Sequence, residues 1–151
     1  FFLNANCFVI KFSPDSSLLA VGLCDGNGVE LYDTNQFELL YTIERSDTVS
    51  ALDWIDAPDT TNERNGVKNK GKGKHIEDDT KANENERRSQ LLAVGSFDGF
   101  VKVYCINFES STDFITLVDS FHVQSEVYSM IFLKDNAISF ARKPLAIMVG
   151  E

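Results

Sequence analysis

Several residue types are scarce in this sequence, and each scarcity argues against a class of protein. The 151 residues include three prolines, two histidines, one tryptophan and three widely spaced cysteines without a CxxC pair. The odd cysteine count predicts buried, reduced thiols in an intracellular protein and no disulfide framework. The histidines, His75 and His122, lie far apart and away from any cysteine pair, so the spacing of a zinc site is missing and we expect no metal.

Basic residues and long apolar runs are scarce as well. The chain has 14 Lys and Arg residues against 23 Asp and Glu, which gives a net charge of −9. Phosphate binding needs clustered cations, so this charge disfavours a nucleic-acid partner. No run approaches the roughly eighteen apolar residues of a membrane-spanning helix. The opening FFLNANCFVIKF lacks the basic region and the cleavage site of a signal peptide. We therefore expect a cytoplasmic or nuclear protein with no membrane partner.

The sequence does contain one motif that occurs twice. LLAVG stands at residues 18–22 and again at 91–95, and each copy is followed by an Asp-Gly pair and an alternating run. Asp-Gly and Asn-Gly favour the positive φ angles of hairpin turns, and the flanking runs are rich in β-branched and aromatic residues. This pattern predicts strands at residues 7–12, 18–22, 29–32, 37–43, 48–55, 91–95, 100–106, 114–121, 126–132 and 144–150.

The spacing of the motif predicts sheets of four strands each. Gly22 and Gly95 are 73 residues apart, or 39 when the charged segment 56–89 is left out. Four-stranded propeller repeats run about 40–45 residues. We therefore expect the two LLAVG runs to be equivalent strands of neighbouring sheets, and we expect a third, incomplete sheet that includes Gly150.

The segment 56–89 differs in composition from the rest of the chain. It contains eight acidic and eight basic residues and very few apolar ones, so it cannot bury a core, and we expect it to be disordered. Its run KNKGKGKH is compatible with a nuclear-import or polyanion-binding patch, but we favour a solvated low-complexity loop without a specific task.

This order of motifs resembles the WD-repeat β-propeller family. VIKFSPDSSLLAVGLCDGNGVELYD follows the family's succession of first strand, Ser-Pro-Asp turn, second strand, Asp-Gly turn and third strand, and LLAVGSFDGFVKVYC matches the later half of the next blade. The run AVGSFDGFVKVY is also similar to blades of the echinoderm microtubule-associated-protein-like group. The resemblance implies an all-β partial propeller of about three antiparallel four-stranded blades, at 5–43, 48–121 (interrupted by 56–89) and 126–151, the last incomplete, within one unit of residues 1–151.

The resemblance also implies structural site residues. In the family a His, a Ser or Thr, the turn Asp and a Trp form a hydrogen-bonded tetrad inside the blade. The Gly-His pair that should precede a first strand is absent at Glu44–Arg45, so we expect blades held mainly by core packing, with each turn Asp bonded locally to backbone amides. The matching positions are Asp25 and Asp98 for the turn Asp, Tyr32 and Tyr104 in place of the Trp, and His122 as either a degenerate tetrad residue or a plain exposed loop residue.

A propeller closes as a ring of about four to eight blades, which leaves no long unprotected sheet edge. The 117 residues outside 56–89 make fewer than three blades. We therefore expect this chain to be part of a larger propeller.

Motifs for catalysis or cofactor binding are incomplete. GVKNKGK at 66–72 imitates a phosphate-binding loop, but Gly73 stands where Ser or Thr is needed. DGNGVE at 25–30 lacks the later ligands of a calcium loop, and a hairpin turn explains it better. No Ser lies in a G-x-S-x-G context, and Trp54 ends a strand, where core packing explains it. We expect no catalytic residue and no cofactor.

The function implied by the resemblance is a protein–protein interaction scaffold and not an enzyme. We expect other proteins as partners, and the sequence disfavours small molecules as well as nucleic acid. Two alternatives stay open: a cytoskeleton-binding, microtubule-associated propeller module, and a propeller enzyme whose active site lies outside this chain.

Overall fold

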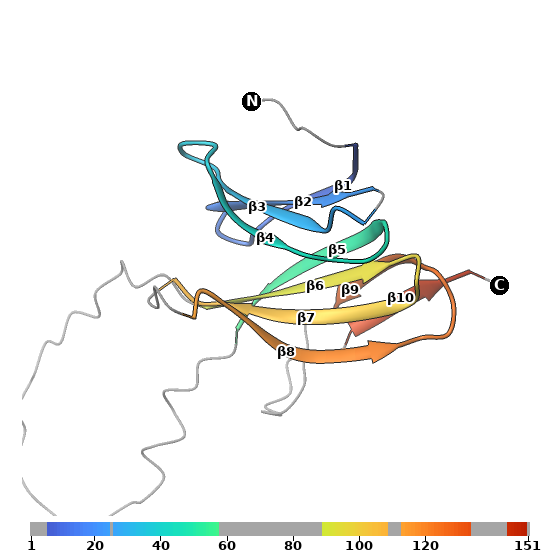
Figure 1. Cartoon of the computed structure of the whole chain (residues 1–151). Helices are drawn as coiled ribbons and strands as arrows, with labels where there is room; N and C mark the ends of the chain where they lie inside the picture. Colours follow the sequence, from blue (N-terminus) through green and yellow to red (C-terminus); the bar gives the residue numbers. More distant parts are fainter. Residues whose placement is uncertain (1–5, 25, 58–88, 109–112, 134–144, 151) are drawn as a thin grey trace, which may run out of the picture.

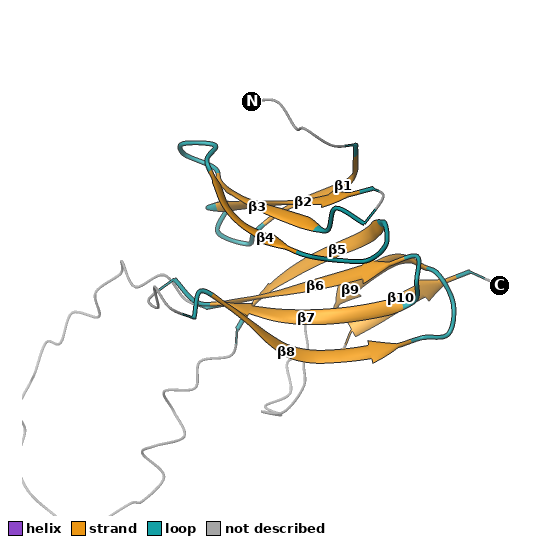
Figure 2. Ribbon diagram, in the orientation of Figure 1, coloured by secondary structure: helices purple, strands orange, loops and turns teal. Residues whose placement is uncertain are grey.

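The computed structural model describes residues 6–24, 26–57, 89–108, 113–133 and 145–150, and within these ranges the chain is all-β, without a helix (Figures 1 and 2). Ten strands form three antiparallel sheets of four, four and two strands. The first sheet contains β1 (Cys7–Phe12), β2 (Leu18–Leu23), β3 (Val29–Asp33) and β4 (Leu39–Ile43), the second β5 (Val49–Asp56), β6 (Gln90–Ser96), β7 (Phe100–Ile106) and β8 (Ile115–His122), and the third β9 (Val127–Phe132) and β10 (Leu145–Val149).

This architecture confirms the predicted fold class and the predicted order of strands. Each sheet is a meander in which consecutive strands pair, and the two LLAVG runs form β2 and β6, the second strand of their sheets. The expected hairpin geometry is present too, because Gly26, Gly28 and Gly99 all have φ near +80°. Asp25 and nearly all of the charged segment, residues 58–88, lie outside the described residues.

One packing contact recurs at both junctions between sheets. A Cβ added to Gly22 would lie 2.7 Å from Cγ1 of Val49, and a Cβ added to Gly95 would lie 2.7 Å from Cγ1 of Val127. Both valines are fully buried, and each belongs to the first strand of the following sheet. The glycine of LLAVG therefore admits the next sheet at close range, which an alanine does not allow without a shift.

The hydrophobic core lies between the sheets. The larger cluster joins the first two sheets, and a second cluster joins the second sheet to β9. β5 is central to both, because it contacts β1 on one side and β9 on the other. The members of the larger cluster are Leu18, Ala20, Val29, Leu31, Ile43, Val49, Leu52, Trp54, Leu92, Val94, Tyr104 and Ile106.

Asp53 connects the first strands of all three sheets. Its side chain is buried in β5, where Oδ2 accepts a hydrogen bond of 2.7 Å from the N–H of Phe132 in β9. Oδ1 lies 3.2 Å from the Nζ of Lys11 in β1. Trp54 strengthens the same junction, since its indole N–H donates to the carbonyl of Lys11 at 3.2 Å. A single buried carboxylate thus holds β1, β5 and β9 together.

The cysteines differ from the prediction in one respect. All three are free thiols, as expected, but Cys7 is exposed and Cys24 and Cys105 are half-buried. The prediction of buried thiols is wrong because Cys7 lies on β1, a strand in which most residues are exposed.

Candidate functional site

A hydrogen-bonded group of side chains surrounds the turn between β6 and β7. The turn forms because Gly99 has φ of +80° and its N–H donates to the carbonyl of Ser96 at 3.0 Å. The carboxylate of Asp98 accepts the N–H of Phe100 at 3.0 Å and the hydroxyl of Ser96. Arg45, from the connection between β4 and β5, donates to the same hydroxyl, and its Nη2 lies 3.4 Å from Oδ1 of Asp98. The group therefore ties the sheet-to-sheet connection to the hairpin turn.

Arg45 is the most unusual member of this group because it is a buried cation. Its side chain is 2% exposed, and its Nε has no hydrogen-bond partner. The Nη2 atom also lies 3.5 Å from the carbonyl of Phe100, so one guanidinium nitrogen serves three acceptors. Such a charge is stable only when it is paired, which makes Asp98 its essential partner.

The electrostatics of Asp98 and Tyr104 follow from these contacts. Burial raises the pKa of Asp98, but hydrogen bonds from Ser96 and the Phe100 N–H, the charge of Arg45 and the Ser46 hydroxyl together lower it below its usual value. Burial raises the pKa of Tyr104, and the charge and hydrogen bond of Arg45 oppose that rise only in part. Asp98 is thus held as an anion and Tyr104 as a neutral phenol.

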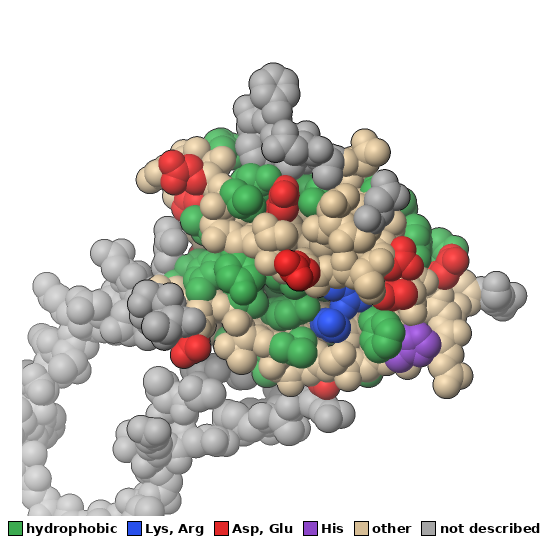
Figure 3. All heavy atoms as spheres, in the orientation of Figure 1, with side chains coloured by type: hydrophobic (Ala, Val, Ile, Leu, Met, Phe, Trp, Pro, Cys, Tyr) green, Lys and Arg blue, Asp and Glu red, His purple; other side chains and the backbone are tan. Residues whose placement is uncertain are grey.

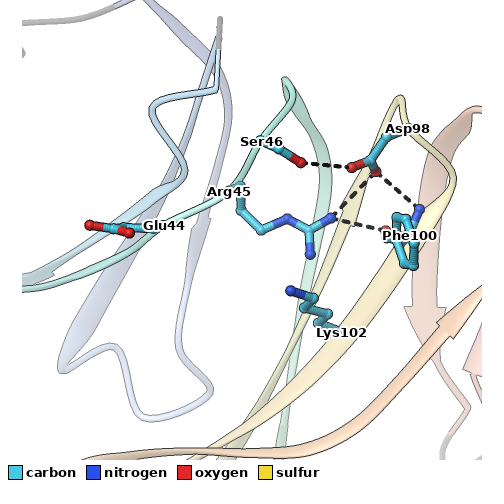
Figure 4. Close-up of a pocket in the computed structure, with 6 residues that line it drawn as sticks. All are labelled: Glu44, Arg45, Ser46, Asp98, Phe100 and Lys102. Carbon is cyan, nitrogen blue, oxygen red and sulfur yellow. Dashed lines mark hydrogen bonds and ion pairs between the residues drawn. The ribbon is translucent and has the colours of Figure 1, made fainter.

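A polar cavity opens beside this group (Figure 4). Its volume is about 380 Å³. Lys102 of β7 lines it, and Figure 4 shows the ammonium group of Lys102 directed toward the guanidinium of Arg45, while the carboxylate of Glu44 points away. The full lining is Glu44, Arg45, Ser46, Asp98, Phe100 and Lys102. The lining thus combines two acidic and two basic side chains.

No protein-family model and no curated protein matches this chain.

Two further observations bear on chemistry. Within the described ranges, no three His, Cys, Asp or Glu side chains are grouped so that they would hold a metal ion. The same part of the chain contains no helix long and apolar enough to cross a membrane.

The structure places the predicted site residues in different surroundings. Asp98 caps its turn through a backbone amide, and it also takes part in the wider group with Arg45. Tyr104 belongs to that group, whereas the hydroxyl of Tyr32 donates to Oε2 of Glu30 at 2.5 Å. Burial and then the Glu30 contact raise the pKa of Tyr32 to about 12. Asp25, the equivalent of Asp98, lies outside the described residues.

His122 touches the backbone of the same turn. It is the last residue of β8, exposed, with its ring 4.7 Å from that of Phe100. Its Nε2 lies 2.9 Å from the carbonyl of Asp98, and its Nδ1 accepts the N–H of Gln124 at 3.3 Å. Because a backbone N–H only donates and a carbonyl only accepts, Nδ1 is the acceptor and Nε2 the donor in these two contacts. His122 therefore packs against the outside of the turn and bonds to its backbone, without a hydrogen bond to the Asp98 carboxylate.

Sequence reasoning missed Arg45, Ser96 and Lys102. A signal for Arg45 was present, because Glu44–Arg45 stands where the family pattern calls for Gly-His, and the structure brings Arg45 to the turn Asp. Ser96 stands two residues before Asp98, within reach of its carboxylate. Lys102 gave no sequence signal beyond its place in an alternating strand.

Proposed function

We propose that this chain is a protein-interaction scaffold, a portion of a WD-repeat-like β-propeller that presents strand edges and loops to other proteins inside the cell. The repeated four-stranded sheets and the Gly–Val contact at both junctions support the propeller part of this proposal. Rigid stacked sheets of this kind suit the presentation of a fixed surface.

The observation that carries the scaffold function is the exposed apolar surface of the outer strands. Large side chains on β4 and β8 are about half exposed, and Figure 3 shows hydrophobic side chains gathered in the region between the first and second sheets. Contiguous apolar surface on a folded protein marks interaction sites. The side chains on these two strands are Leu39, Leu40, Tyr41, Leu117 and Val118.

The polar groups support the same proposal. Asp98 and Arg45 form an ion pair within the fold, Asp53 joins three strands, and both ring nitrogens of His122 have backbone partners. A catalytic acid or base needs a proton site within reach of substrate. These side chains serve the architecture instead, which favours a binding function over an enzyme.

The test is direct reconstitution with a purified partner. Proteins crosslinked to the 151-residue chain are identified, produced separately and titrated against it by calorimetry. We expect Leu117→Glu on β8 to weaken binding at least about tenfold while melting changes little, and the matched change at its exposed neighbour, Thr116→Glu, to leave binding intact. Turnover of a broad substrate panel that Asp98→Ala abolishes without lowering the melting temperature would overturn the proposal in favour of an enzyme.

A further inference from the structure

The cationic side chains of the folded part are concentrated at one place. Residues 6–24, 26–57, 89–108, 113–133 and 145–150 contain only three Lys or Arg residues, namely Lys11, Arg45 and Lys102. Lys11 pairs with Asp53, and Arg45 pairs with Asp98. Lys102 forms no ion pair with a described residue, and it lines the cavity together with Arg45. Two of the three cations therefore face the same small volume.

The acids at this cavity do not neutralise Lys102. Asp98 is occupied by Arg45, two hydroxyl groups and the N–H of Phe100. The Glu44 carboxylate points away from the ammonium group of Lys102 in Figure 4. Arg45 pairs with Asp98, so Lys102 is the cation of the cavity that has no ion pair with a described residue, and the buried guanidinium Nε of Arg45 also lacks an acceptor. An anion placed here would have a cation on each side.

The neighbouring surface is aromatic. Phe100 lines the cavity and is about two-fifths exposed. Figure 3 shows the small basic patch on this face bordered by hydrophobic and acidic side chains. A ligand that fits both features has an anionic group next to an apolar side chain.

We propose that this cavity binds a carboxylate side chain of an extended acidic segment in a protein partner, with an adjacent apolar side chain against Phe100. The inference rests on the proposed function and names its partner class. A single carboxylate can form the ion pair that Lys102 lacks among the described residues. A phosphate group has up to two negative charges and meets stronger repulsion from Glu44 and Asp98, so it fits less well.

The probe is a displayed library of random twelve-residue peptides, selected on the full 151-residue chain. We expect the enriched peptides to place Asp or Glu beside an aromatic or aliphatic residue. The tightest peptide, made synthetically with a fluorophore, should bind Lys102→Met about tenfold more weakly and Lys102→Arg almost as well as the original chain. Lys72→Met removes the same charge from the segment 56–89 and should have no effect.

A double-mutant cycle assigns the contact. Replacing the acidic residue of the peptide by its amide should weaken binding to the original chain about tenfold, as Lys102→Met does. The same replacement should not weaken binding to Lys102→Met any further. A phosphoserine at that position should bind no better than the carboxylate, and tighter binding would make phosphate the true ligand and overturn the inference. Melting curves confirm that Lys102→Met, which keeps the aliphatic stem, remains folded.

The outcomes separate this inference from the proposed function. Enrichment of peptides without an acidic residue overturns the inference, and so does equal binding of the peptide to Lys102→Met and to the original chain. If a reconstituted protein partner binds Lys102→Met as tightly as the original chain, the inference is overturned but the scaffold function stands. A library that yields no peptide overturns the inference as well. Absence of both a peptide and a protein partner overturns both proposals.

Discussion

Removal of the Asp53 carboxylate tests whether one buried side chain holds three strands. Asp53→Ala leaves the buried N–H of Phe132 without an acceptor and Lys11 without its anion. Loss of the hydrogen bond to a charged acceptor costs about 2–3 kcal/mol of unfolding free energy, because the amide stays desolvated. The Lys11 pair adds at most about 1 kcal/mol, since half of the lysine side chain is exposed. We expect Asp53→Ala to lose about 2–4 kcal/mol in total.

Two companion variants divide this loss between its causes. Asp53→Asn keeps an oxygen for the N–H of Phe132 and should cost about 1 kcal/mol, and Lys11→Met should cost less than about 1 kcal/mol. Urea unfolding followed by tryptophan fluorescence suits the measurement, because Trp54 is the one tryptophan and lies buried next to Asp53. If Asp53→Ala lost no more than Lys11→Met, the hydrogen bond to Phe132 would contribute nothing and the reasoning would be refuted.

Three further predictions concern other parts of the fold. Asp98→Ala leaves the buried Arg45 unpaired and should cost about 3 kcal/mol in urea unfolding, and a loss under about 1 kcal/mol would show that Arg45 needs no anion. Gly95→Ala places a Cβ 2.7 Å from Val127 and should cost about 1–3 kcal/mol, of which Val127→Ala in the same chain should restore part; an additive double variant would rule out the contact. Asp15 has its pKa lowered to about 2, because hydrogen bonds from Ser and Gln side chains and a backbone amide outweigh burial. Its contribution to stability should be complete above its ordinary value of 3.8 and lost as the pH falls toward 2, so Asp15→Asn should flatten acid unfolding in that window.

The strands were predictable because their signals are local. The alternation around β3 and β7 and the Asp-Gly pair before β7 depend only on neighbours in sequence, and the structure has those strands and the turn. β4 begins at Leu39, two residues later than predicted, since Phe37 adopts a positive φ of 54° and remains in the turn. Ends of strands depend on such turn geometry, which composition does not specify.

The candidate site was only half predictable because its other half is non-local. Asp98 and Gly99 predict a turn, but the partner of the Asp98 carboxylate is Arg45, more than fifty residues earlier in the chain. The two closing tyrosines look equivalent in sequence, yet Tyr104 meets that arginine and Tyr32 meets Glu30. Which polar groups meet is decided by how neighbouring sheets stack, and no single repeat contains that information.

The close contact between glycine and valine has a consequence for protein engineering. Gly22 lies in the first sheet and Val49 in the second, so the two halves of the contact belong to different sheets although they are near in sequence. A module cut at the boundaries of a sheet separates the glycine from its valine. In the recombined protein, each glycine then packs against a residue that was not selected to fit it. A module that runs from Gly22 to Val49, or from Gly95 to Val127, transfers the glycine together with the valine that it contacts. Recombination of such repeats therefore preserves the glycine–valine packing when the crossover points lie one strand away from the boundaries of the sheets.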